Sequence, residues 1–196
     1  NAGPTDRYEG PIGDTWHALI NGTYAFGNVR IGDFKLWDTA ALAAELSYAG
    51  LDKVTKNAGL YKTRSNPLAA ATCGAGLDEV LNSCSTDDFY NFALQFQPTW
   101  LQVYPGTDMY LGAVYVVGLK GTAPTNGGGN ESSGQYKITL GFDYHVKHKL
   151  ELAYTAFLGK KRYLGATSGG HPVKATVGGG TFADRDWFGA TYTYNF

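Results

Sequence analysis

The sequence predicts an all-β fold: a membrane-spanning antiparallel β-barrel, of which this chain supplies about seven C-terminal strands. Three observations support this prediction. Apolar residues alternate with polar ones in several long segments, which is the pattern of strands with one apolar face. The connections between these segments are alternately short and long. Aromatic residues make up 14% of the chain and charged residues 17%, a balance that suits strands between lipid and a polar lumen.

The predicted strands cover residues 14–27, 36–50, 88–103, 109–119, 135–146, 149–159 and 186–196. In the first, Trp16, Ile20 and Tyr24 share one face, whereas Asn21 and Thr23 share the other. The second, fifth and sixth alternate in the same way. The fourth is apolar on both faces, so the direction in which its residues point is left open.

The last strand has the clearest pattern, W-F-G-A-T-Y-T-Y-N-F over residues 187–196. Phe188, Ala190, Tyr192, Tyr194 and Phe196 form one face, which is aromatic at its C-terminal end. Barrel strands carry aromatic residues where they meet the membrane interface. A buried edge strand of a soluble sandwich is the alternative interpretation.

Connection lengths indicate how the strands are oriented. The connections at 28–35, 105–108 and 147–148 are short, whereas those at 51–87, 120–134 and 160–185 are long. Outer-membrane barrels have short periplasmic turns and long extracellular loops. We therefore expect residues 51–87 to form a long extracellular loop and residue 196 to lie in the periplasm.

The odd number of strands predicts an incomplete barrel. Bacterial single-chain barrels have an even number of strands, from about 8 upward. We therefore expect residues 1–196 to be the C-terminal part of a larger transmembrane β-barrel, whose remaining N-terminal part is its partner. A complete barrel of about eight strands, with one strand missed by the pattern, is the alternative.

Charge and hydropathy exclude other classes of protein. The net charge of −1 gives no indication of nucleic-acid binding. No run of about 18 apolar residues predicts a transmembrane helix. The mean hydropathy of −0.24 suits a barrel, because every second strand residue faces a polar lumen.

The two cysteines, Cys73 and Cys84, lie in the predicted extracellular loop. An oxidising compartment favours a disulfide between them, and closing a loop of this size contributes about 3 kcal/mol in the chain-entropy model. Metal binding is the weaker alternative, because there is no Cys-x-x-Cys pair and no nearby His.

The inward-facing residues of the predicted strands would line the lumen. The predicted lining residues are Glu45, Gln95, Gln97, Lys137, Asp143, His145 and Glu151. Rings of one charge sign select ions, so this mixture predicts a weakly selective or plugged pore. Pairing of these charges with one another inside the barrel is an equally physical interpretation.

Aromatic residues of the outward face predict girdles at the two membrane interfaces. The predicted girdle residues are Trp16, Tyr24, Phe26, Tyr48, Trp100, Tyr144, Tyr192, Tyr194 and Phe196.

A charged rim cluster, Asp184, Arg185 and Asp186, precedes the last strand. It predicts either a site for a cation, a lipid phosphate or a partner loop, or a local salt-bridged cap on the strand. The second interpretation is favoured, because exposed ion pairs contribute only about 0–1 kcal/mol. No Gly-x-Ser-x-Gly or His-Glu-x-x-His motif is present, so we expect no enzyme activity, no metal and no cofactor.

The closing aromatic strand with its terminal Phe resembles those of bacterial outer-membrane β-barrels. Three stretches further resemble the proteobacterial family known as domain of unknown function 1302. They are residues 97–108 with Gly118-Leu-Lys-Gly121, Phe142-Asp-Tyr144 with residues 152–159, and Asp184-Arg-Asp-Trp187. The resemblance covers the half of the chain from residue 88 on.

This resemblance implies a bacterial outer-membrane location and contact with outer-membrane lipid and lipopolysaccharide. It also implies an association with a periplasmic lipoprotein or an RND-type exporter. The implied function is a channel or transporter that passes small, hydrophobic or lipid-like compounds through the barrel lumen. A non-conducting barrel that binds a partner protein or exporter is the alternative. The family supplies no catalytic residues.

Overall fold

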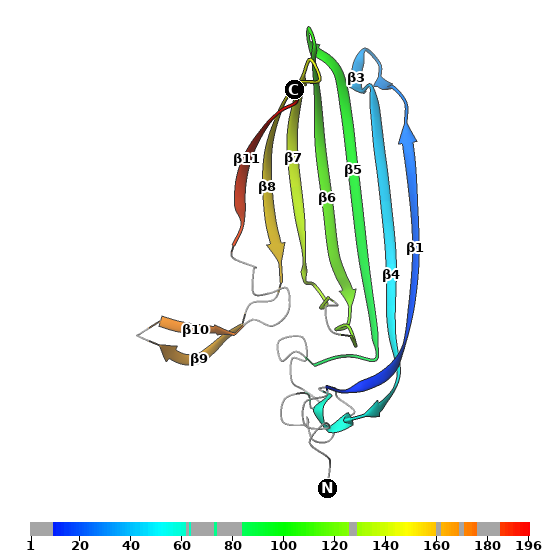
Figure 1. Cartoon of the computed structure of the whole chain (residues 1–196), viewed down its shortest axis with the longest axis vertical. Coiled ribbons are helices and arrows are strands. Elements are labelled where there is room, and N and C mark those ends of the chain that lie inside the picture. Colours follow the sequence, from blue (N-terminus) through cyan, green and yellow to red (C-terminus); the bar gives the residue numbers. More distant parts are fainter. Residues whose placement is uncertain are drawn as a thin grey trace.

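The computed structural model describes residues 10–61, 63, 73, 84–125, 129–159, 162–168, 171–175 and 185–196. Within these residues the chain is almost entirely β-structure (Figure 1). The strands are β1 (Ile12–Phe26), β2 (Val29–Ile31), β3 (Phe34–Trp37), β4 (Thr39–Lys56), β5 (Asp88–Tyr104), β6 (Thr107–Lys120), β7 (Gly134–Tyr144), β8 (His148–Leu158), β9 (Arg162–Ser168), β10 (His171–Ala175) and β11 (Trp187–Tyr194). A single turn of 3₁₀ helix, Ala58–Leu60, follows β4.

Seven strands form one antiparallel sheet in the order β1-β4-β5-β6-β7-β8-β11 (Figure 1). The predicted all-β antiparallel fold is therefore confirmed. The sheet is open, because β1 and β11 have no partner on their outer edges within the described residues. Since each neighbour reverses direction, the two edge strands run the same way. An open, one-layer sheet of this kind is consistent with a segment of a barrel wall.

The seven predicted strands correspond to the seven strands of this sheet, with three corrections to the connections. The strand β4 continues to Lys56, so the predicted loop at 51–87 begins about six residues too early. The predicted short connection at 28–35 contains the hairpin β2–β3, and the long one at 160–185 contains β9–β10. Strands of three to seven residues contain too few alternations for a two-residue period of polarity to be recognised in the sequence.

Register across the sheet separates its residues into two faces. One continuous row of paired residues crosses all seven strands and is apolar: Tyr24, Leu42, Phe96, Ala113, Ile138, Tyr154 and Phe188. The adjacent row points to the other side: Thr23, Ala43, Gln95, Val114, Lys137, Thr155 and Trp187. The sides that these rows occupy are called the apolar face and the polar face below.

The register also decides the facing of β6, which the sequence leaves open. Met109 and Leu111 pair with Phe142 and Leu140 and so belong to the apolar face. Tyr110, between them, belongs to the polar face.

No described segment covers the apolar face. Ile20 is 70% exposed and Phe188 66% exposed, at or near opposite edges of the sheet, and Ile138 in its middle is 46% exposed. No helix within the described ranges is long and apolar enough to cross a membrane. The buried apolar cluster of the molecule lies instead on the polar face at the end with the long loops, where Ala49, Phe89 and Ala123 pack together.

Candidate functional site

The polar face brings together six of the seven residues predicted to line a lumen. Glu45, Gln95, Gln97, Lys137, Asp143 and Glu151 all lie on this face by their register. The placement of His145 is corrected: it lies in the turn after β7, with φ of 51°, and not within a strand.

A hollow of about 320 Å³ lies on the polar face where β1, β4, β5 and β6 adjoin. The small side chains of Ala43 and Ala93 form its floor, and Asn21, Thr23 and Gln95 supply hydrogen-bonding groups around it. Glu45 carries the one charge among the lining residues. The sequence pattern does not reveal this hollow, because alanine occurs equally on polar and apolar faces.

A charged cluster occupies the same face near the short turns. The Tyr110 hydroxyl donates a hydrogen bond to the Glu151 carboxylate, and Lys149 Nζ lies 3.4 Å from Glu151 Oε1. The ammonium group of Lys149 also lies 5.4 Å from the centroid of the Tyr110 ring. Glu151 is therefore paired locally, with Lys149 and Tyr110.

Asp143 lies beside this cluster, opposite Asp108 on β6 and Lys149 on β8. Its Oδ1 atom is buried and has no hydrogen-bond partner. Within the described part of the chain, no group of three or more His, Cys, Asp or Glu side chains has a geometry that would hold a metal ion.

A loop-end cap covers the other end of the polar face; it consists of residues 57–61, 84–87, 121–125 and 129–133. Phe89 is its anchor, 6% exposed and paired in register with Ala49. Ala123 packs on this pair. The Phe89 ring also lies against Gly118 and Gly129, and a Cβ at Gly129 would overlap it. The described part of the loop after β6 therefore folds over the polar face.

Tyr61 ties the two loops of the cap together. Its hydroxyl donates a 3.2 Å hydrogen bond to the carbonyl of Pro124, which is 63 positions away in sequence. Burial of the Tyr61 ring raises the pKa of its hydroxyl above the ordinary value. The neutral, hydrogen-bonding form of Tyr61 is therefore the stable one at neutral pH.

The predicted disulfide is confirmed. Cys73 and Cys84 form a bridge with a Cα–Cα distance of 5.7 Å, and both side chains are fully buried. The bridge ends at residue 84, where the chain enters the cap, so it restrains one of the cap segments.

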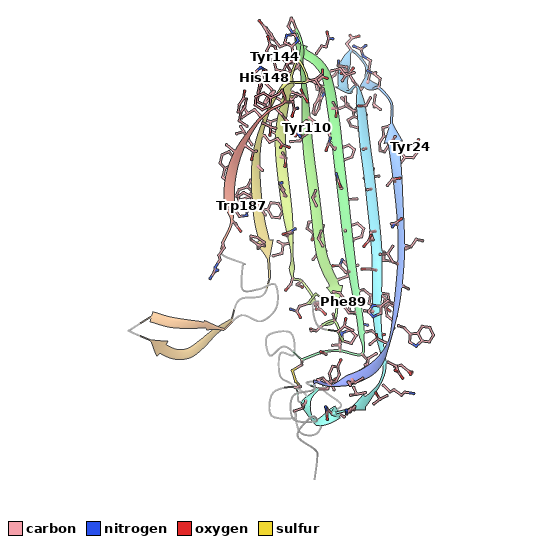
Figure 2. All side chains as sticks on the ribbon, in the orientation of Figure 1. Tyr24, Phe89, Tyr110, Tyr144, His148 and Trp187 are labelled. Atoms are coloured by element: carbon pink, nitrogen blue, oxygen red, sulfur yellow. A yellow bond between two sulfur atoms is a disulfide. The ribbon has the colours of Figure 1, made fainter. Side chains whose placement is uncertain are left out.

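The residues of the predicted girdles all lie on the apolar face or in contact with it. Near the short turns, Tyr24 and Phe26 meet edge to face at 4.7 Å. Tyr144, His148, Tyr192, Tyr194 and Phe196 form a second group there, in which His148 Nδ1 and the Tyr192 hydroxyl are 2.7 Å apart (Figure 2).

The remaining girdle residues lie on other parts of the apolar face. Tyr48 is nearer the long loops and donates a 2.7 Å hydrogen bond to Asp88. Trp16 is 71% exposed, and Trp100 pairs with Met109. Whether these rings meet a membrane interface stays a prediction.

Of the predicted rim cluster, Asp184 lies outside the described residues, and Asp186 has two hydrogen-bond partners on β8. The Asp186 carboxylate accepts hydrogen bonds from the Tyr154 hydroxyl at 2.9 Å and from the Phe157 amide at 3.2 Å. Asp186 therefore joins the start of β11 to β8 through hydrogen bonds.

Comparison with known proteins finds one family model, described as Protein of unknown function (DUF1302), which matches residues 7–196. The match includes the N-terminal half, which the resemblance from residue 88 on did not cover. Searches of the curated proteins and of the solved structures each return no match.

Proposed function

Because the chain belongs to the DUF1302 family, whose description assigns no activity, we propose its function from the sheet itself. We propose that the seven-stranded sheet is part of the wall of a transmembrane β-barrel in a bacterial outer membrane. Its apolar face meets lipid, and its polar face lines a lumen through which small, hydrophobic or lipid-like compounds pass.

One observation carries this proposal: a single-layer sheet has one continuous apolar face, and no described segment covers that face. Soluble proteins rarely expose a contiguous apolar surface of this extent. A soluble sandwich would bury it against a second sheet. A lipid bilayer supplies the missing apolar contact, and alternating strands are the structure that presents lipid with only one face.

The lengths of two strands support the proposal, whereas β1, β4, β5 and β6 are longer, with 15, 18, 17 and 14 residues. β7 and β8 contain 11 residues each, close to the ~9–11 residues with which a tilted strand crosses a bilayer. The turns after β5 and β7 are short and lie at the same end as the hairpin β2–β3 (Figure 1). By the usual arrangement of outer-membrane barrels, this end faces the periplasm.

The two edges of the sheet, unpaired within the described residues, indicate that further strands complete the barrel. A bilayer cannot satisfy unpaired backbone N–H and C=O groups, so β1 and β11 need partners there. The two edges run in the same direction, so direct closure would pair them in parallel. An antiparallel barrel therefore requires an odd number of additional strands between them. A second copy in the same orientation adds seven strands, yet its β1 would pair with β11 in parallel, so it does not complete an antiparallel barrel.

A second candidate is a non-conducting barrel that binds a partner protein or an exporter. The observation that favours it is the loop-end cap, whose anchor Phe89 packs against Ala123 over one end of the polar face. A cap in this position narrows the route along the polar face at the end with the long loops.

Tryptophan fluorescence in lipid vesicles tests the location of the two faces. We would place tryptophan at Leu140 or at Thr139 in a background whose four native Trp are Phe. Lipids brominated on their acyl chains should quench the Leu140→Trp variant and leave its neighbour on the polar face, Thr139→Trp, nearly unaffected. Equal quenching of both variants would rule out the proposed orientation.

Planar-bilayer recording separates the two candidate functions. Conduction is expected if the polar face lines an open lumen, with weak preference between cations and anions because its charges are of both signs. A protein that passes the quenching test and does not conduct would be the partner-binding barrel.

A further inference from the structure

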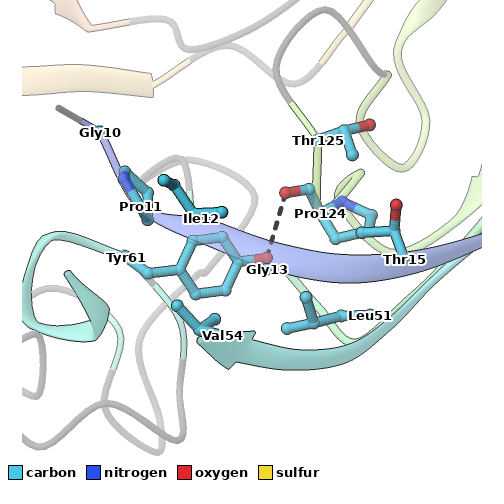
Figure 3. Close-up of a pocket in the computed structure, with 10 residues that line it drawn as sticks. All are labelled: Gly10, Pro11, Ile12, Gly13, Thr15, Leu51, Val54, Tyr61, Pro124 and Thr125. Carbon is cyan, nitrogen blue, oxygen red and sulfur yellow. Dashed lines mark hydrogen bonds between the residues drawn. The ribbon is translucent and has the colours of Figure 1, made fainter. Parts of the chain in front are cut away.

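A pocket of about 390 Å³ lies at the long-loop end and is lined in part by the loop-end cap (Figure 3). Its walls come from three parts of the chain: the start of β1, the end of β4 with Tyr61, and the loop after β6. The lining residues are Gly10, Pro11, Ile12, Gly13, Thr15, Leu51, Val54, Tyr61, Pro124 and Thr125.

Irregular pairing opens this pocket. The ladder between β1 and β4 shifts register twice near its end, between Ile12 and Gly13 and between Asp14 and Thr15. Shifts of this kind bend a strand and turn its side chains to new directions. At Gly13 the backbone of Lys53 comes so close that any side chain would overlap it.

Tyr61 completes the wall. Figure 3 shows its ring between Ile12 and Val54, with its hydroxyl reaching the carbonyl of Pro124. The side chain is 8% exposed, so its position is determined by packing as well as by this hydrogen bond. The pocket is thus built by a buried ring that bridges two loops.

The lining selects an uncharged, apolar ligand. None of the ten lining residues is charged. Asp14 and Lys53 come from the same strand ends, yet they pair with each other at 3.4 Å and do not line the pocket. A buried ligand charge would therefore have no charged partner among the described lining residues, which is strongly unfavourable.

The size of the pocket narrows the class of ligand further. An apolar cavity of about 150 Å³ holds one benzene molecule, and ligand pockets start at about 300 Å³. We propose that this pocket binds an uncharged hydrocarbon group the size of two fused aromatic rings, or a segment of alkyl chain of equal volume. Binding of this kind requires no conduction, so the inference goes beyond the proposed transport function.

Photolabelling of the protein in lipid nanodiscs tests the site. The probe is 1-azidonaphthalene, and the labelled peptides are mapped by mass spectrometry. Labelling of residues 10–15, 51–61 and 121–125 should fall at least tenfold with a hundredfold excess of naphthalene. Labelling near Leu140 and Leu152 should not fall, because partitioning into lipid does not saturate. The proposal is overturned if neither naphthalene nor an alkyl competitor reduces the labelling of the pocket segments.

The alkyl competitor distinguishes two sources of the same chemistry. If a dodecyl-chain lysophospholipid competes as well as naphthalene, the natural ligand is a lipid chain. Competition by naphthalene alone indicates a compact ring compound. If neither compound competes with the probe, the proposal is overturned.

Two variants provide an independent test. Val54→Glu places a charge in the pocket and should reduce saturable labelling at least tenfold. Val146→Glu is the matched control in an exposed turn at the opposite end, and it should leave labelling unchanged. If Val54→Glu fails to fold, Val54→Phe fills the pocket without a charge and should have the same effect. Unchanged labelling in a folded Val54 variant would overturn the proposal, whereas absent labelling near Leu140 would count against the membrane location alone.

Discussion

At the scale of single residues, Gly141 determines where the hydrogen-bonded pair of Tyr110 and Glu151 lies on the polar face. A Cβ at this position would overlap the ring of Tyr110, which crosses the glycine on its way to Glu151. Because Gly141 has no side chain, the Tyr110 ring occupies the space above it. Lys149 forms an ion pair with Glu151 beside this ring. Sequence alternation cannot indicate such a space, because it records only the polarity of each position.

We predict that Gly141→Ala destabilises the protein by about 1–3 kcal/mol, the usual cost of forcing extra volume into a packed site. Gly22→Ala is the control, because a Cβ at Gly22 meets nothing within 4 Å. The measurement is the guanidinium unfolding midpoint in lipid vesicles. An equal effect of the two substitutions would show that the Tyr110 ring does not depend on Gly141.

Asp38 is the second residue with a defined role, because it joins the hairpin β2–β3 to β5. Its carboxylate accepts hydrogen bonds from Lys35 Nζ at 2.9 Å and from the Leu101 amide at 2.8 Å. The hydrogen bond from Lys35, followed by that from Leu101, lowers the pKa of Asp38 below its ordinary value of 3.8. A lowered pKa means that the charged form stabilises the fold above this pH, and that stabilisation is lost as pH falls through the folded-state pKa.

We therefore predict that the Leu101 amide is protected from hydrogen exchange at neutral pH and loses this protection as the pH falls through the folded-state pKa of Asp38, which lies below the ordinary value. Asp38→Ala should abolish this protection at neutral pH. Asp33→Ala, in the exposed turn between β2 and β3, should preserve it. A Leu101 amide that stays protected in the Asp38 variant would show that the carboxylate does not hold the hairpin.

At the scale of elements, each strand of the sheet has two faces whose surroundings differ. Leu140 on β7 and Leu152 on β8 are directly paired on the apolar face. Thr139 and Ala153, the adjacent pair, lie on the polar face. Neighbouring pairs of residues thus make matched tests of the environment of each face.

Leu140→Arg or Leu152→Arg should cost about 2–4 kcal/mol if the apolar face lies at the bilayer midplane. Thr139→Arg should cost much less, because its side chain points to the polar face. The measurement is again unfolding in lipid vesicles. A Leu140→Arg variant as stable as the parent would mean that this face does not meet lipid.

The disulfide restrains the segment between β4 and β5. Its removal should lower stability by about 3 kcal/mol in the chain-entropy model. The chain has two cysteines in all, so a reductant acts on this bridge alone. Dithiothreitol should bring the wild-type unfolding midpoint to that of the Cys73→Ser, Cys84→Ser double variant and leave the variant unchanged. A midpoint that dithiothreitol does not alter would show that the bridge is energetically neutral.

At the scale of the whole molecule, the open edges are the feature with the largest consequence. β1 presents 15 residues along an edge that no described strand pairs with. An edge of this length is a template for another strand, and in lipid it must be paired.

We predict that in the assembled protein in nanodiscs the amides of β1 and β11 are as protected from hydrogen exchange as those of the interior strand β5. An edge left open to water would expose about every second amide, because alternate N–H groups point away from the neighbouring strand. Fast exchange at half of the β1 amides would contradict the barrel proposal.

The sequence by itself determined the class of the fold, the seven strands of the main sheet and the existence of two faces. It did so because alternation of polarity is a local property that each strand carries within about ten residues. It also indicated the disulfide, since the chain contains only Cys73 and Cys84. The facing of β6 was not determined, because both of its faces are apolar.

Only the tertiary structure decided which residues meet across strands. The register placed Tyr110 beside Glu151, brought Ala43 and Ala93 together as the floor of a hollow, and folded Ala123 onto Phe89. These contacts join positions that lie about 30 to 50 places apart in the chain. Their geometry depends on hydrogen-bond register and on bulges, and neither leaves a signal in the polarity of single residues.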